Sequence, residues 1–347
     1  MGIKVVKFGG SSLADAEHFR QVASIVRADP TRRYVVASAP GKRRADDTKV
    51  TDMLYHCYEM AHNREDITEY FRRIADRYNT IIRDLGMSFD MSGELDYVRD
   101  SIQHHTGRDF AASRGEYLNS IILAKYLGFD FIDAESVIFF KDNGLFDDEK
   151  TNAMMREELK KHTHAVIPGF YGVMPNGTIK TFSRGGSDIT GSIVARACEA
   201  ELYENWTDVS GCLMADPRIV PNPRPIRTVT YRELRELSYM GATVLHEDAI
   251  FPVRFAGIPI NIRNTNDPGA PGTMIVASTG EYDGSTVITG IAGKKGLSVI
   301  TIEKDMMNAE IGFGRKVLDV LEDNEISFEH LPSGVDTMSV VVPTKSL

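Results

Sequence analysis

One stretch, S-R-G-G-S-D-I-T-G-S at residues 183–192, combines residue types that can bind an anion. A strand-like run at 178–182 leads into it, and a helical run at 189–202 leads out of it. A glycine-rich turn between a strand and a helix lets the backbone approach a ligand closely and aims free N–H groups at a negative charge. Arg184 adds a planar guanidinium suited to a carboxylate or phosphate, and Asp188 falls where a helix N-cap is expected. Taken alone, this turn is equally compatible with ordinary turn chemistry.

A second glycine-rich turn follows the first predicted strand. The pattern at residues 3–8 predicts a buried strand, which ends in Gly9-Gly10-Ser11-Ser12. Lys7 places a cation beside these glycines, and the alternative is a lysine that merely snorkels from the strand. The turn matches neither G-x-x-x-x-G-K-[ST] nor G-x-G-x-x-G, so a nucleotide site here is of another type.

The elements around this turn predict a parallel β-α-β unit. A helix with Phe19, Val22, Ala23 and Val26 on one face follows the turn, and 34–39 is the next apolar strand. Ligands of such sheets bind at the carboxyl ends of the strands. The predicted strand 202–206 also ends in polar residues, Thr207 and Asp208. The charged loop 41–49 is either a lid over phosphates or a solvated loop.

The remaining pattern predicts an α/β domain followed by a smaller segment. Residues 52–127 are mostly helical, and Asn176-Gly177 predicts a hairpin. Thr230 and Glu233 form a capping box for a helix at 231–240. Further strands are predicted at 129–133, 137–140, 165–170 and 258–263, with a helix at 151–162. The small, polar run 277–285 suggests a boundary, so the predicted domains are 1–280, with a helical insertion at about 52–110, and 286–347. The second is a β-β-α-β-β segment with its elements at 287–292, 297–302, 313–323, 326–331 and 337–342.

Composition excludes several classes of function. The formal net charge of −9 argues against a nucleic-acid-binding surface. No apolar run approaches the roughly 20 residues of a membrane span, and the N-terminus shows no signal-peptide pattern. Three scattered cysteines argue for a reducing compartment, the cytoplasm, and against a disulfide framework or zinc site.

These motifs, in this order and spacing, resemble the amino-acid kinase superfamily, and the match to the aspartate kinase family is close. The matching segments are 7–12, 183–192, 206–211, 215–218 and 241–246. The resemblance implies a carbamate-kinase-like three-layer α/β sandwich with a mainly parallel sheet. It also implies a partial α+β ACT (ferredoxin-like) regulatory segment at 286–347. The expected reaction is transfer of the γ-phosphoryl group of ATP to the side chain of L-aspartate, the first step towards lysine, threonine and methionine.

The resemblance also implies residue roles. Lys7 and Asp188 are the expected catalytic residues: Lys7 bridges the transferring phosphoryl oxygens, and Asp188 fixes Lys7 and the substrate amine. Arg184 is expected to bind the α-carboxylate and Glu116 the ammonium group, although Glu116 without the family match suggests a solvated helix residue. The other expected substrate contacts are Ser38, Thr51, Phe170, Gly185, Gly186 and Ser187. The expected nucleotide contacts are Lys7, Gly9, Gly10, Ser11, Thr207, Asp208, Leu213, Arg218 and Thr243, with Mg²⁺ held mainly by the nucleotide. The expected effector contacts, for lysine or threonine, are Met307, Phe313, Ser327 and Glu329.

Two features depart from the family pattern. The family often has a lysine in the run that here reads Gly241-Ala242-Thr243-Val244-Leu245-His246, and Thr243 cannot supply its charge. The family also carries two intertwined ACT units, whereas this sequence ends at Leu347 after about half of them. We therefore expect a homodimer with kinase activity but weak or absent feedback inhibition.

Two alternatives remain open at this stage. The acceptor of the same chemistry can be glutamate, N-acetylglutamate or carbamate, although Arg184 and Glu116 favour a free amino acid. A catalytically silent amino-acid sensor is the other alternative, against which the retained Lys7, Arg184 and Asp188 argue.

Overall fold

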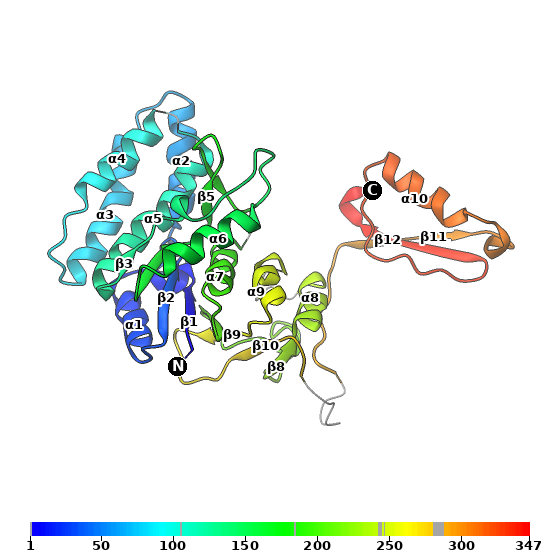
Figure 1. Cartoon of the computed structure of the whole chain (residues 1–347). Coiled ribbons are helices and arrows are strands. Elements are labelled where there is room, and N and C mark those ends of the chain that lie inside the picture. The colour runs from blue at the N-terminus through cyan, green and yellow to red at the C-terminus, as the bar shows by residue number, and fades with distance from the viewer. Residues whose placement is uncertain (1, 105, 184, 242–244, 246, 280–287) are drawn as a thin grey trace. The chain divides into compact units, whose positions relative to one another are not determined.

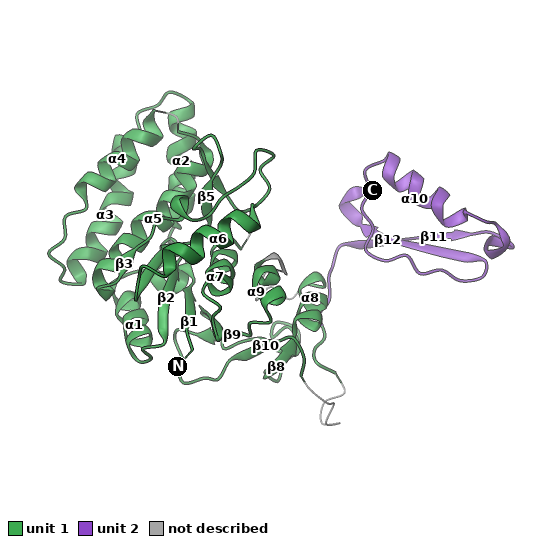
Figure 2. Cartoon of the chain, in the orientation of Figure 1, with its two compact units in different colours: residues 1–291 green, residues 292–347 purple. Residues whose placement is uncertain are grey.

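The computed structural model describes residues 2–104, 106–183, 185–241, 245, 247–279 and 288–347. The chain divides into two compact units, unit 1 at residues 1–291 and unit 2 at residues 292–347 (Figures 1 and 2). Their assignment to a catalytic and a regulatory domain stays a prediction. Within the described residues, no helix combines the length and the apolar character that a membrane crossing requires.

In the described part of unit 1, eight strands form one sheet in the order β3-β4-β2-β1-β7-β9-β10-β8. Neighbouring strands pair in parallel, except for the antiparallel pair β9 and β10. The strands are β1 (Lys4–Phe8), β2 (Arg32–Ala37), β3 (Asp130–Phe131), β4 (Ala165–Pro168), β7 (Leu202–Thr207), β8 (Thr228–Thr230), β9 (Ile260–Asn264) and β10 (Thr273–Val276). A separate hairpin pairs β5 (Tyr171–Val173) with β6 (Ile179–Thr181). The hairpin predicted at Asn176-Gly177 is thus confirmed, and Gly177 has the positive φ of 81° that its turn requires.

Helices cover both faces of this sheet (Figure 1). Val6 and Phe8 of β1 belong to one hydrophobic core and Val5 to the other, because successive side chains of a strand point to opposite faces. One core holds α1 (Ala16–Arg27), α2 (Val50–His62), α3 (Thr68–Asp84), α4 (Ser92–Gln103) and α5 (Arg108–Leu127). The other holds α6 (Asp148–Leu159), α7 (Gly186–Ala197), α8 (Tyr231–Tyr239) and α9 (Phe251–Ala256). The predicted three-layer α/β fold is confirmed.

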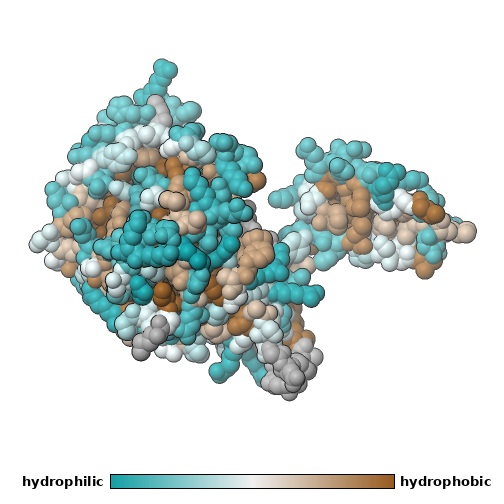
Figure 3. All heavy atoms as spheres, viewed as in Figure 1, coloured by the Kyte–Doolittle hydropathy of each residue, from teal (hydrophilic) through white to brown (hydrophobic). Residues whose placement is uncertain are grey.

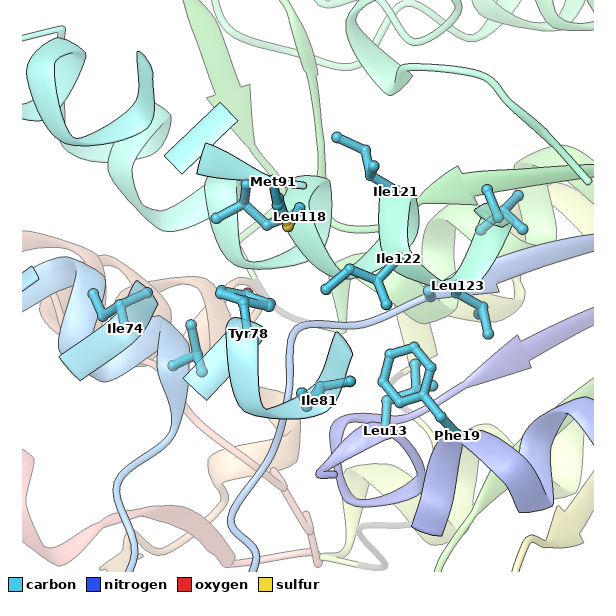
Figure 4. Close-up of a cluster of buried hydrophobic side chains, with 14 of the residues drawn as sticks. Leu13, Phe19, Ile74, Tyr78, Ile81, Met91, Leu118, Ile121, Ile122 and Leu123 are labelled. Atoms are coloured by element: carbon cyan, nitrogen blue, oxygen red, sulfur yellow. The ribbon is translucent and has the colours of Figure 1, made fainter. Parts of the chain in front are cut away.

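The helical layer of α1 to α5 is tightly packed. Figure 4 shows side chains of α1, α3 and α5, among them Phe19, Tyr78 and Ile122, meeting in one cluster. The predicted face of α1 is confirmed, since Phe19, Val22, Ala23 and Val26 are all buried. Outside, the surface of unit 1 in the view of Figure 3 is mostly hydrophilic, with hydrophobic spheres gathered over α9.

Some predicted elements of unit 1 are wrong or shorter than expected. The strand predicted at 137–140 is reduced to two bridges at Phe139 and Phe140. The helix predicted at 151–162 begins earlier, because the side chain of Asp147 accepts a hydrogen bond from the Lys150 amide and caps α6. The capping box of Thr230 and Glu233 is confirmed at the start of α8.

The described residues from 288 onward contain fewer strands than the sequence predicts. Antiparallel strands β11 (Leu297–Glu303) and β12 (Thr337–Pro343) pack their apolar residues against α10 (Phe313–Asp323) around Leu321, Val340 and Val342. The described residues 288–292 form no strand, contrary to prediction. The strand predicted at 326–331 is also wrong: only His330 makes a bridge, to Val341 of β12. The helix predicted at 313–323 is confirmed.

Candidate active site

The first glycine-rich turn lies where β1 and β7 end side by side. The amide of Gly9 donates to the Trp206 carbonyl at 3.0 Å, which continues the ladder one residue beyond β1. The chain then enters a 3₁₀ turn, η1 (Gly10–Leu13). A Cβ on Gly10 would lie 2.9 Å from the Ala39 carbonyl oxygen, and a Cβ on Gly41 would lie 2.6 Å from the Gly10 carbonyl carbon. Residues 9–13 and 39–41 therefore interlock so closely that both positions require glycine.

Lys7 and Asp188 form an ion pair beside this turn. The distance from Lys7 Nζ to Asp188 Oδ1 is 2.6 Å, and Lys7 is only 7% exposed. Asn205 of β7 donates a further hydrogen bond to Asp188 Oδ1 at 2.8 Å. The interpretation of Asp188 as an N-cap is wrong: Gly185, with a φ of 57°, is the N-cap, and Asp188 lies in the first turn of α7. Because its side chain does not cap the helix, the Asp188 carboxylate is available to pair with Lys7 of β1.

A cleft of about 600 Å³ opens over the same strand ends. Eight of the predicted substrate or nucleotide contacts line it: Gly9, Gly10, Ser11, Ser38, Thr51, Glu116, Thr207 and Asp208. Seven other residues line it as well: Ala39, Pro40, Gly41, Lys42, Arg44, Ala45 and Lys49. The charged loop at 41–49 is therefore part of the cleft. Its three lining cations suit an anionic ligand, which a protein of net negative charge has to bind through local positive charge.

Glu116 is a buried carboxyl group on the wall of this cleft. It is 6% exposed, and its Oε2 atom has no hydrogen-bond partner in the structure. Burial raises its pKa to about 8, although a hydrogen bond from the Ala39 amide and the charges of Arg114 and Lys7 favour the ionised form. The interpretation as a solvated helix residue is wrong, because α5 is buried along most of its length. A cationic group that enters the cleft would satisfy the free oxygen of Glu116.

Neighbouring side chains fix the wall that carries Glu116. Asn119, one turn further along α5, donates to the Ser38 carbonyl at 2.7 Å. Tyr78 of α3 donates to the Gly115 carbonyl at 2.8 Å. These buried bonds hold α5 against the end of β2 on one side and α3 on the other. Sequence reasoning missed Asn119 and Asn205, because single buried amides carry no pattern in the sequence.

Phe170 and the start of α7 form a second contact set at the end of β4. Phe170 has a φ of 83°, in the left-handed region that non-glycine residues rarely adopt. Its amide donates to Thr190 Oγ1 at 3.1 Å. A Cβ on Gly186 would lie 2.5 Å from the Phe170 ring, and a Cβ on Gly169 would lie 2.5 Å from Ser187 Oγ. The structure thus brings Phe170, Gly186 and Ser187 together, next to Asp188.

Nine predicted contacts are not among the residues that line the cleft. Five of them are described above: Lys7, Phe170, Gly185, Gly186 and Ser187. Arg184 and Thr243 lie outside the described residues. Leu213 and Arg218 are described but do not line the cleft. The Arg218 guanidinium is 86% exposed and pairs with the Asp216 carboxylate at 2.6 Å.

The four predicted effector contacts lie around α10 in unit 2. Met307 is buried just before α10, and Phe313 begins it. Ser327 and Glu329 follow its end, so about 16 Å of helix separates the two pairs. Glu329 pairs with Lys294.

Residues 2–264 match the amino acid kinase family. The chain belongs to this family. It is also 40% identical to Aspartokinase 3 of Bacillus subtilis, over 98% of this chain and 78% of that protein, which places it among the aspartokinases of the family. Aspartokinase 1, chloroplastic, of Arabidopsis thaliana is 29% identical over 99% of this chain and 64% of its own length.

Solved structures of aspartate kinases are also similar to this chain. The crystal structure of Clostridium acetobutylicum aspartate kinase has a TM-score of 0.92 and 52% identity, and the match covers 100% of this chain and 79% of that one. Escherichia coli aspartokinase III in complex with aspartate and ADP has a TM-score of 0.78 and 24% identity, over 99% of this chain and 79% of that one. At that lower identity the likeness shows the shared fold.

Proposed function

We propose that this chain is an ATP-dependent aspartate kinase, which transfers the γ-phosphoryl group of ATP to the side-chain carboxylate of L-aspartate. The products are 4-phospho-L-aspartate and ADP. Its membership among the aspartokinases supports the reaction class and the acceptor. The observation that supports this chemistry is the pairing of a cation for the phosphoryl group with a carboxyl group for the substrate ammonium. A buried Lys7–Asp188 pair adjoins the Gly9-Gly10 turn, and the unpartnered Glu116 carboxyl group faces the same space.

The acceptor needs no general base. An aspartate side chain has an ordinary pKa of about 3.9, so it is already a nucleophilic carboxylate at pH 7. Catalysis then consists of holding two anions together and stabilising the charge on the transferring phosphoryl group. Lys7 supplies that charge from a site with little water, where an electrostatic interaction is stronger than in bulk solvent. Asp188 and Asn205 hold the Lys7 ammonium group in place.

The substrate side is formed by residues from β2, α2, α5 and α7. Glu116 binds the ammonium group of aspartate, because it is the buried carboxyl group of the cleft with a free oxygen. Ser38 and Thr51 line the same wall. Gly185, Gly186 and Ser187 stand at the start of α7, and Phe170, which follows β4, packs against Gly186. Arg184, from the sequence, binds the α-carboxylate.

The nucleotide side is formed by the Gly9-Gly10-Ser11 turn and the end of β7. Gly9, Gly10 and Ser11 line the cleft, so their backbone can approach phosphate oxygens, as a phosphate cradle requires. Thr207 and Asp208 line the adjoining wall, and Leu213, Arg218 and Thr243 remain sequence-based assignments. Mg²⁺, held mainly by the nucleotide phosphates, would neutralise part of their charge. Asp208 is the exposed carboxylate of the cleft, and a phosphate-held Mg²⁺ needs only one or two such groups from the protein.

We also propose a homodimer that works in the cytoplasm, with unit 2 as the segment that would bind lysine or threonine and with weak or absent inhibition by either. The three free cysteine thiols support a reducing compartment. The effector residues are Met307, Phe313, Ser327 and Glu329, at the two ends of α10. Adding lysine or threonine at millimolar concentration during the activity assay tests this regulation.

An acceptor panel tests the proposed reaction. ADP release is followed in a coupled assay with ATP, Mg²⁺ and one of four acceptors: L-aspartate, L-glutamate, N-acetyl-L-glutamate or carbamate. We expect turnover with aspartate and little with the others, because Glu116 requires a free ammonium group. Turnover that is faster with an acylated acceptor would contradict the assignment of Glu116.

A further inference from the structure

Arg77 is a buried arginine of α3 that does not line the cleft. It is 5% exposed and follows Ile74 and precedes Tyr78 and Ile81, which fasten α3 into the core (Figure 4). Burying a guanidinium costs free energy unless its N–H groups are hydrogen-bonded and its charge is paired. The acceptors that Arg77 finds belong to the loops of the cleft rather than to its own helix.

The Arg77 guanidinium holds three points of the chain at once. Its Nη2 donates to the Ala14 carbonyl at 2.9 Å, just after η1, and to the Gly41 carbonyl at 2.7 Å. Its Nη1 lies 2.8 Å from Asp47 Oδ2. Gly41 in turn donates its amide to the Gly10 carbonyl at 2.8 Å. One rigid side chain thus links α3, the end of the glycine-rich turn and both ends of the loop 41–47.

Asp47 anchors the second end of this loop. Its carboxylate accepts from the side chain and the amide of Arg43, at 2.8 and 3.0 Å, as well as from Arg77. These bonds, those of Arg43 first, hold the pKa of Asp47 far below its usual range, so the anchor stays charged at neutral pH. Between the fixed points Gly41 and Asp47, the loop carries Lys42 and Arg44, which line the cleft.

We propose that Arg77 is a positioning residue for phosphoryl transfer, which fixes the loop 41–47 so that Lys42 and Arg44 face the phosphates bound at the glycine-rich turn. This proposal rests on the proposed kinase function. Two exposed cations on a free loop would lose much of their interaction energy to side-chain and backbone entropy. A loop tied at both ends removes the backbone part of that loss, and within it Lys42 donates to the Ala45 carbonyl and Arg44 pairs with Asp46. A misplacement of about 1 Å in such a site reduces the rate by about 10²-fold.

Three variants separate loop anchoring from a general effect on stability. Asp47→Ala removes the carboxylate that Arg77 binds in the loop. Arg77→Lys retains the positive charge, but a lysine side chain cannot bind the three acceptors of the arginine together. Arg43→Ala is the matched control, because it also removes a partner of Asp47 but leaves the bond to Arg77, and its side chain is 43% exposed. For each variant, kcat and the KM values for ATP and aspartate are measured, together with the Kd of ADP and the Tm.

We expect Asp47→Ala to lower kcat/KM for ATP by about 10- to 100-fold and to weaken ADP binding, while the KM for aspartate changes less than about threefold. Arg77→Lys should fall between Asp47→Ala and the wild type, and Arg43→Ala should stay within about threefold of the wild type. Equal losses in Arg43→Ala and Asp47→Ala would overturn the proposal, as would a lowered Tm with unchanged kinetic constants. If Asp47→Ala does not fold, Asp47→Asn gives the same comparison with a side chain of equal size.

The ADP measurement separates this proposal from the reaction itself. Suppose that the wild-type chain phosphorylates no acceptor, while Asp47→Ala still weakens ADP binding strongly and Arg77→Lys weakens it less. In that case the proposed reaction is wrong and the anchoring by Arg77 is supported. If aspartate is phosphorylated and ADP binds all variants equally, the anchoring fails and the reaction stands.

Discussion

Aspartate binding should release a proton from Glu116. With a pKa of about 8 in the free protein, this carboxyl group is mostly neutral at pH 7. An ammonium group against its free Oε2 favours the charged form, so the complex holds Glu116 ionised. The predicted consequence is release of about 0.9 proton per aspartate bound at pH 7, and of about 0.5 at pH 8.

The same linkage fixes the direction and size of the pH effect on affinity. Below pH 8 the Glu116 proton has to leave before aspartate binds, so affinity rises with pH. The apparent Kd should fall by about 50-fold between pH 6 and pH 8, since each pH unit well below the pKa is worth about 1.4 kcal/mol. Above pH 8 the dependence flattens.

Calorimetry in two buffers of different ionisation enthalpy counts the protons directly. Glu116→Gln should bind aspartate weakly and lose this proton release. Glu135→Gln is the control, because the pKa of Glu135 is also raised by partial desolvation, while its side chain is exposed and does not line the cleft. Glu135→Gln should leave the count unchanged. A wild-type chain that binds aspartate without releasing a proton at pH 7 would refute the role assigned to Glu116.

Stability gives an independent check with the opposite trend. The folded pKa of Glu116 lies above its unfolded value, so its contribution to stability is complete below about pH 4.5 and is lost as pH rises through about 8. Without aspartate, the Tm of the wild type should therefore fall from pH 6 to pH 9 more than that of Glu116→Gln. Parallel curves for the two proteins would contradict the assigned burial.

Three further predictions concern the glycine-rich turns. Lys7→Ala should lower kcat by about 10³-fold while ADP binding weakens less, and a variant that keeps more than a tenth of the wild-type kcat in the ADP-release assay excludes Lys7 as the phosphoryl clamp. Arg184→Lys should raise the KM for aspartate by about tenfold or more, since a lysine cannot make the bidentate contact; a rise in the KM for ATP alone would reassign Arg184 to the nucleotide. Gly41→Ala should destabilise the chain by about 1–3 kcal/mol in denaturant unfolding and weaken ADP binding, because its Cβ would meet the Gly10 backbone; Gly93→Ala, with open space around it, is the control, and equal effects would refute the close approach.

Much of this arrangement follows from local patterns in the sequence. The apolar strand at Lys4–Phe8, the helix face of Phe19 and the capping box of Thr230 depend on neighbours in the chain, and the structure confirms them. The segments of Lys7 and Asp188 are predictable for the same reason, because each residue adjoins its own glycine-rich turn.

Other features depend on contacts that no local pattern encodes. Glutamate is a residue type usually found at the surface, and the burial of Glu116 follows from the packing of α5 between α2 and the strands β4 and β6. Arg77 lies in a helix whose charge pattern resembles that of any exposed helix, yet its partners are 30, 36 and 63 residues away. The strand predicted at 326–331 has suitable residues but only one bridge to β12, so propensity alone misplaced it.

The pairing of β1 has a consequence for how the chain folds during synthesis. Lys4 of β1 pairs with Arg32 on one side and with Leu202 on the other. On the ribosome, β1 therefore gains β2 early but waits for most of unit 1 to emerge before β7 covers its other edge. Over the same interval Lys7 lacks Asp188, so the nascent chain carries an open strand edge with an unpaired lysine on it. Because a lysine on an open strand edge opposes pairing with other chains, we expect Lys7 also to limit aggregation of the unfinished sheet.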